Sequence, residues 1–123
     1  IHLLDYVPRS ALPSLYRNAV ALVFPSLYEG FGFPLLEAMS MGTPVITSDR
    51  SAMTEVTMGA ALRVNPFRIT AIQRAMESML RGDLHSRYRG KGRARSASFS
   101  WEGSADDLLT VFSEAAAPRS DRS

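Results

Sequence analysis

The feature that most constrains the fold is an alternation between short apolar runs and segments with helical periodicity. Apolar runs occur at residues 2–7, 21–24, 44–48 and 60–64. The connections between them are too long for hairpins, and strands joined through helices pair in parallel with right-handed crossovers. The alternation therefore predicts an α/β fold with a parallel sheet of about four strands flanked by helices. The run 21–24 is continuous and apolar, which is typical of a strand buried on both faces.

Helical patterns follow the strands and occupy the whole last part of the chain. We expect helices from Ser10, as N-cap, to Asn18, and from Pro34 to Met41 with Gly42 as C-terminal cap. Three more are expected at 69–81, 84–97 and 101–117, the last after a Ser100 cap. Four strands are few for a doubly wound fold. The arrangement therefore resembles the second half of a Rossmann-like domain, residues 1–117, with a disordered polar tail at 118–123.

Composition excludes several classes of protein. The 123 residues suit one domain, the absence of cysteine excludes a disulfide scaffold or thiolate metal site, and 46% hydrophobic residues argue against disorder. No apolar run approaches the roughly 20 residues of a membrane-spanning helix. The first residue is Ile1, which opens directly into the first predicted strand, so we expect a segment upstream of it.

Positive charge is concentrated in one segment. Residues 81–95 hold six basic side chains against Asp83 alone, whereas the net charge of the whole chain is only +2. Such a run favours either an anionic membrane or nucleic acid as partner, or else is an ordinary solvated helix face. Because aromatic residues are scarce in it and no groove-reading motif is present, we expect no nucleic-acid binding. The solvated face is the favoured interpretation, and peripheral membrane association stays open.

The chemistry is concentrated in a glycine-rich stretch, residues 25–37, that follows the second predicted strand. Open α/β sheets bind ligands beyond the carboxyl ends of their strands. Gly30 and Gly32 let a ligand approach the backbone, and the helix N-terminus that follows offers free N–H groups to a phosphate. Glu29 and Glu37 add carboxylates that suit sugar hydroxyls. This combination favours a nucleotide sugar as ligand.

The stretch also resembles the signature of a known family. Two glutamates at a spacing of eight lie within Pro-Ser-Leu-Tyr-Glu-Gly-Phe-Gly-Phe-Pro-Leu-Leu-Glu-Ala-Met, followed by Gly-Thr-Pro-Val-Ile at 42–46, Glu55-Val56, Asn65-Pro66 and Phe-Ser-Trp-Glu at 99–102. These motifs resemble retaining glycosyltransferases of family 4, which have the GT-B fold. The resemblance covers residues 3–116 and implies the C-terminal, donor-binding lobe of such an enzyme.

The resemblance implies a role for each matching residue. Glu29 would be catalytic, lying beside the donor sugar and stabilising the oxocarbenium-like transition state, and Glu37 would bind the ribose. Backbone groups of the loop and helix start would hold the sugar and the diphosphate: Gly30, Phe31, Gly32, Phe33, Leu35 and Leu36. The loop Tyr6–Arg9, with Val7 and Arg9, would lie near the nucleobase. In such enzymes the leaving diphosphate helps to deprotonate the acceptor, and no metal or other cofactor is required.

Each residue also has an ordinary structural explanation. Glu37 is favourable near a helix N-terminus and Glu29 suits a solvated loop. Phe31 and Phe33 are expected to pack rather than to act as stacking platforms. Glu55 either reaches the ligand or ends a short helix. Trp101 is expected to anchor the last helix in the core or against another lobe.

The implied activity is transfer of a sugar from a nucleotide-diphosphate sugar to an acceptor (a saccharide, a lipid-linked or a small molecule) with retention of configuration. The family's Arg and Lys that neutralise the diphosphate, and its acceptor-binding N-terminal lobe, would precede this chain. We therefore expect the chain alone to be inactive. The expected location is the cytoplasm, at the inner face of the membrane if the acceptor is lipid-linked. The alternative is a non-catalytic module that binds nucleotide sugars or another partner.

Overall fold

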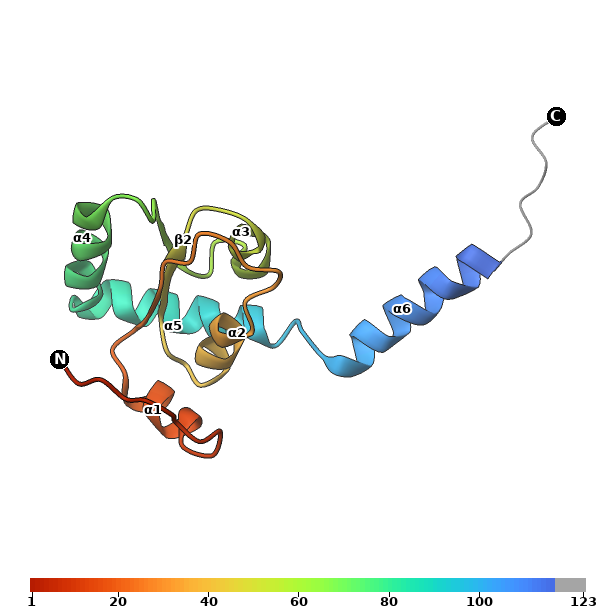
Figure 1. Cartoon of the computed structure of the whole chain (residues 1–123), viewed down its shortest axis with the longest axis horizontal. Coiled ribbons are helices and arrows are strands. Elements are labelled where there is room, and N and C mark those ends of the chain that lie inside the picture. The colour runs from red at the N-terminus through yellow and green to blue at the C-terminus, as the bar shows by residue number, and fades with distance from the viewer. Residues whose placement is uncertain (117–123) are drawn as a thin grey trace.

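A three-stranded parallel sheet forms the centre of the molecule in a computed structural model, which describes residues 1–116 (Figure 1). Its strands, in spatial and chain order, are β1 (Leu22–Phe24), β2 (Val45–Ser48) and β3 (Leu62–Val64). Both pairings are parallel. The predicted α/β class is confirmed, with three strands where about four were expected.

The register of the sheet separates two hydrophobic clusters. Val23, Ile46 and Leu62 lie side by side across the three strands and pack with the helix that follows β3. The neighbouring pair, Leu22 and Val45, belongs to the cluster on the other face. All four residues of β2 are buried because helices cover both of its faces. The residues of β1 are only half-buried, which corrects the expectation of a strand buried on both sides: β1 is an edge strand of this sheet.

Residues 1–116 form six helices, of which α6 lies away from the sheet. Their bounds are α1 (Leu12–Asn18), α2 (Phe33–Ser40), α3 (Ala52–Thr57), α4 (Ile69–Met79), α5 (Gly82–Ser96) and α6 (Trp101–Ala116). α2 and α3 supply Leu35, Met39, Met53 and Val56 to one cluster, and α4 supplies Ala75 and Met79 to the other. α5 contacts both α2 and α4 (Figure 1). The predicted helices are confirmed within about two residues at most ends, and α3 is a short helix at Glu55, which the sequence analysis gave only as one of two alternatives and without bounds.

The end of α2 is set by a glycine, as the sequence predicts. Gly42 has φ +78°, its N–H donates to Met39, and the Thr43 N–H donates to Ala38. This is the Schellman pattern, in which the left-handed residue lets the last helical carbonyls find donors. Gly92 lets α5 pack closely against α2, since a Cβ at this position would lie only 3.1 Å from Met39 Cγ.

Two expectations for the N-terminal segment are wrong. Residues 1–8 form neither helix nor strand, and Leu3, Leu4 and Tyr6 are exposed. A strand needs a neighbour for its backbone groups, and no strand within residues 1–116 pairs with this segment. Ser10 does not cap α1 either. Ala11 is the N-cap residue without a side-chain hydrogen bond, and its N–H closes a turn onto Pro8.

The last helix differs from the others because every residue of α6 is exposed and the helix projects away from the body (Figure 1). The predicted Ser100 cap is confirmed, since its Oγ accepts the Gly103 N–H at 2.9 Å. Trp101 is 77% exposed, so the expected anchoring of this residue in the core is wrong. Ala117 and the predicted tail at 118–123 lie outside the described residues. Within the part of the chain described, no helix combines the length and apolar character needed to cross a membrane.

Candidate functional site

The glycine-rich loop lies at the carboxyl end of β1 and is fixed at Glu29. The Ser26 hydroxyl donates to Glu29 Oε1 at 3.0 Å, and the Ser51 hydroxyl donates to the Glu29 carbonyl oxygen at 3.0 Å. Ser51 comes from the connection that follows β2, the neighbouring strand. The half-buried Glu29 is therefore held from both sides at the carboxyl edge of the sheet, where α/β proteins bind ligands.

Ser51 holds Glu29 from a strained backbone. Its φ of +52° and ψ of −152° fall outside the regions that residues with a side chain normally occupy. Such strain costs on the order of 1–3 kcal/mol and persists where the surrounding structure maintains it, often at functional sites. Close by in the chain, Ser48 at the end of β2 is buried, and its hydroxyl forms no hydrogen bond with any group of residues 1–116. The strained backbone of Ser51 and the hydroxyl of Ser48, unpaired within residues 1–116, thus lie together just after or at the carboxyl end of β2, where α/β sheets bind ligands.

The start of α2 is built on Gly32. This buried residue has φ +94°, and a Cβ there would lie 3.2 Å from Leu35 Cδ1. No side chain caps the helix, and Pro34 occupies its first turn. The Leu35 N–H already donates to the Gly32 carbonyl at 3.0 Å, and the Leu35 side chain is fully buried. Leu35 therefore shapes the first turn of α2. The N-terminus of this helix has no side-chain cap within residues 1–116 and carries the positive end of the helix dipole.

Glu37 lies apart from Glu29, on the side of α2 that faces α1. It is exposed, and its Oε2 accepts a hydrogen bond from the Tyr16 hydroxyl at 3.3 Å. Burial first, and then the negative charge of Glu37 and the hydrogen bond to it, raise the pKa of Tyr16 above its ordinary value of 10.0. The pair therefore sets the orientation of the Glu37 carboxylate.

A hollow of about 170 Å³ brings Glu37 together with Arg9, both of which the sequence singled out. Its lining is completed by Leu12, Pro13, Tyr16, Ser40 and Met41. Val7 does not line it, but lies in a separate open hollow of about 560 Å³ along the N-terminal segment. Of the two residues predicted near a nucleobase, only Arg9 is thus adjacent to Glu37.

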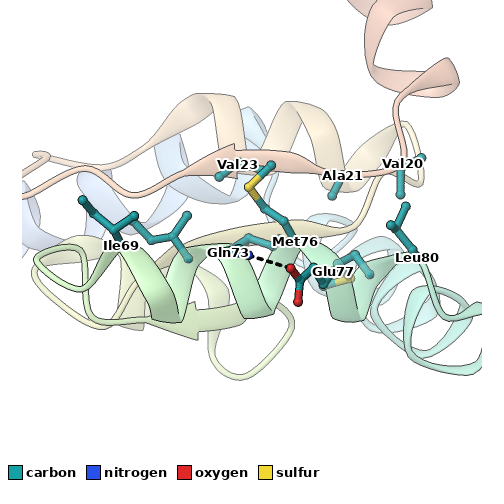
Figure 2. Close-up of a pocket in the computed structure, with 11 residues that line it drawn as sticks. Val20, Ala21, Val23, Ile69, Gln73, Met76, Glu77 and Leu80 are labelled. Atoms are coloured by element: carbon teal, nitrogen blue, oxygen red, sulfur yellow. Dashed lines mark hydrogen bonds between the residues drawn. The ribbon is translucent and has the colours of Figure 1, made fainter. Parts of the chain in front are cut away.

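A further hollow of about 500 Å³ lies between β1 and α4 and contains none of the predicted site residues (Figure 2). Val23, Ile69 and Met76 are among the apolar side chains that line it. Gln73 and Glu77 are its polar residues, and they hydrogen-bond to each other at 2.8 Å. The lining offers little to a polar ligand, so we place the candidate site at the glycine-rich loop.

Sequence reasoning found the loop and both glutamates but missed the residues that fix them. Ser26 lies within the quoted signature without a role assigned to it, whereas Ser51 and Tyr16 lie outside that signature and reach the glutamates only through the folded chain. Glu55, left open by the sequence, lies within α3 with an exposed side chain. Within residues 1–116 there is no group of three or more His, Cys, Asp or Glu side chains arranged to hold a metal ion.

Comparison with known proteins defines the class to which this fold and site belong. The structure matches sucrose-phosphate synthase from Thermosynechococcus elongatus with a TM-score of 0.78 and 30% identity, over 91% of this chain and 29% of that protein. The class is thus that of glycosyltransferases with the GT-B fold. Residues 1–95 match the family model described as glycosyl transferases group 1, and the chain belongs to that family.

Curated relatives agree with this assignment. O-antigen chain mannosyltransferase B of Escherichia coli is 38% identical over 91% of this chain and 30% of its own length. MMP alpha-(1->4)-mannosyltransferase of Mycolicibacterium hassiacum is 32% identical over 95% of this chain and 30% of its own length. The chain thus spans less than a third of the length of these relatives.

Proposed function

We propose that the protein to which this chain belongs transfers a sugar from a nucleotide-diphosphate sugar to an acceptor with retention of configuration. Residues 1–117 would supply the donor-binding part, in the C-terminal lobe. The observation that carries this proposal is the half-buried Glu29, held by Ser26 and Ser51 beside an uncapped helix N-terminus. A carboxylate there would stabilise positive charge on the sugar, and the helix start would favour the diphosphate.

Other residues of the site have separate roles in the proposal. The backbone of the loop and helix start faces the sugar and the diphosphate: Gly30, Phe31, Gly32, Phe33 and Leu36. The N–H of Leu35, which the family resemblance also implied as a donor-binding group, already donates to the Gly32 carbonyl, so Leu35 is left out of this set. Glu37, oriented by Tyr16, accepts hydrogen bonds from the ribose hydroxyls, and Arg9 borders the base in the hollow that both residues line. No metal or other cofactor is part of the proposal. Because two of the relatives are named for mannosyl transfer, a mannosyl nucleotide is the first donor to test.

Substitution of the two glutamates in the full-length protein tests the assignment. We expect Glu29→Ala to lower turnover by about 100-fold or more, the factor typical of losing one charge-stabilising group, with little change in nucleotide affinity. Glu37→Ala should mainly weaken nucleotide binding, measured by calorimetry. Near-normal turnover of Glu29→Ala would contradict the catalytic role. Nucleotide-sugar binding without transfer in the full-length protein would instead support a non-catalytic binding module.

Two further parts of the proposal concern partners and location. We place the protein in the cytoplasm, and we expect the chain alone, without an N-terminal lobe, to transfer no sugar. The exposed basic residues of α5 favour an additional contact with an anionic membrane surface. Such a contact would bring a lipid-linked acceptor to the enzyme.

A further inference from the structure

Four aromatic rings connect the glycine-rich loop to the start of α6. The Phe31 and Phe33 rings lie 4.8 Å apart between centroids, on either side of Gly32. Phe31 meets Phe99 edge-on at 5.9 Å, and Phe33 stacks on Trp101 at 6.0 Å with an interplanar angle of 23°. These distances lie within the range in which aromatic pairs attract. The loop is thereby tied to residues that lie far along the sequence.

The far end of this connection is fixed to the body of the molecule. The Arg95 guanidinium lies 4.5 Å from the centre of the Phe99 ring. Its Nε donates to the Val56 carbonyl at 2.8 Å and its Nη2 to the Glu55 carbonyl at 2.9 Å, both near the end of α3. Arg95, which belongs to α5 and is hydrogen-bonded to α3, therefore holds the Phe99 ring in place. Phe99 in turn supports the Phe31 ring.

Burial does not account for these rings. Phe31 is 37% exposed, Phe33 53% and Trp101 77%, so none belongs to either hydrophobic cluster. Within the loop, Gly30 is exposed and a Cβ there would meet nothing within 4 Å, whereas Gly32 is buried and its carbonyl accepts the Leu35 N–H. The rings on both sides of Gly32 therefore add restraint to the part of the loop that packing leaves exposed.

We propose that Phe99 and Trp101 are positioning residues for the donor site: through Phe31 and Phe33 they hold the glycine-rich loop in the conformation that receives the diphosphate and the sugar. This inference rests on the proposed function, because the loop must be the donor site for its positioning to matter. Neither residue touches the donor in this proposal. Their effect is to keep the loop organised before the donor arrives, which lowers the cost of binding it.

The test compares three variants of the full-length protein: Trp101→Ala, Trp101→Phe and Leu108→Ala. We expect Trp101→Ala to raise the KM for the nucleotide sugar about 3- to 10-fold, the factor expected from losing one aromatic pair, with a smaller change in kcat. Trp101→Phe keeps a ring against Phe33 and should restore most of the loss. Leu108 is 53% exposed on the same helix and lies outside the aromatic connection, so Leu108→Ala should leave KM unchanged.

A thermal unfolding measurement separates positioning from stability. Because Trp101 is largely exposed, the Trp101→Ala protein should melt close to the wild type while its donor KM is raised. Phe99→Ala, measured the same way, should raise KM as well. Donor KM within about twofold of wild type in both alanine variants would overturn the inference, since that is less than one aromatic pair contributes. If Glu29→Ala still abolishes turnover in that case, the proposed function stands and only the positioning role fails.

Discussion

At the residue scale, replacing two glycines of the same loop by alanine is predicted to have very different effects on the stability of the fold. Gly32 has φ +94° and a Cβ there would press on Leu35, whereas a Cβ at Gly30 would meet nothing within 4 Å and its φ is not positive. Gly32→Ala should therefore destabilise the fold by about 1–2 kcal/mol or more, the cost of a side chain in the left-handed region. Gly30→Ala should stay within about 0.5 kcal/mol. Urea unfolding of both variants measures this, and equal effects would contradict the loop conformation.

The Tyr16–Glu37 pair predicts a pH dependence on the alkaline side. Because burial and the Glu37 carboxylate raise the pKa of Tyr16 in the folded protein, folding favours the protonated phenol. The resulting stability is fully present below the ordinary pKa of 10.0 and is lost as the pH rises through the higher folded value. Glu37→Gln removes the charge and should lower the pKa of Tyr16, although burial still keeps it raised.

An absorbance titration of tyrosinate measures this shift. Tyr16→Phe is the control that identifies the Tyr16 signal among the four tyrosines of the chain. A titration curve identical in Glu37→Gln and wild type would show that the carboxylate does not act on the phenol.

The candidate site also shows at this scale what a sequence can predict. Glu29, Glu37 and Gly32 are recognisable because their chemistry and spacing lie within a single short stretch, residues 25–37. The contacts of Ser51 with Glu29 and of Tyr16 with Glu37 span 22 and 21 positions. They exist only because β2 lies beside β1 and α1 beside α2, so the sequence predicts the site without its supports.

At the scale of secondary-structure elements, the accuracy of a prediction from sequence depends on whether the residues that define the element are consecutive. α4 is predicted closely because its apolar periodicity lies in consecutive residues, and α5, although polar on all sides, is predicted within two residues at each end. α3 has six residues and follows an N-cap residue, Ser51, whose backbone is strained, which no pattern indicates. The strand expected at 2–7 fails for the opposite reason: its apolar residues suit a strand, but a strand depends on a partner elsewhere. Composition alone therefore overpredicts strands.

Arg95 is predicted to stabilise the packing of α5 against α3. It donates two hydrogen bonds to the last carbonyls of α3, where a positive charge is also favourable to the helix dipole. Arg95→Ala should destabilise the chain by about 1–3 kcal/mol, since two charge-assisted hydrogen bonds are lost. Arg87→Ala is the matched control, because this exposed arginine of the same helix donates no hydrogen bond to another element within residues 1–116. Equal losses of unfolding free energy in the two variants, measured by urea unfolding, would contradict this role of Arg95.

At the scale of the whole molecule, charge is divided between α5 and the rest. Residues 81–95 carry an excess of positive charge, while the chain has a net charge of only +2, so the remainder is acidic overall. Most basic side chains of α5 are exposed, and the ion pair that the described residues do form, Arg50 with Asp49, lies elsewhere. α5 therefore attracts anionic surfaces, whereas the rest of the chain, which is acidic overall, does not add to this attraction.

This distribution predicts weak, salt-sensitive binding to anionic vesicles through α5. Each basic side chain near such a surface contributes about 1 kcal/mol, and the attraction is screened within about 10 Å at roughly 0.1 M salt. In a flotation assay we expect phosphatidylserine vesicles to carry the chain at low salt and to release it at high salt. Removing three of the five basic side chains of α5 with Arg87→Gln, Arg89→Gln and Lys91→Gln together should abolish flotation. The control with equal charge loss, Arg50→Gln, Arg63→Gln and Arg68→Gln together, should retain it, because these exposed residues lie outside α5. Equal flotation of the two triple variants would show that net charge alone, and not α5, determines the contact.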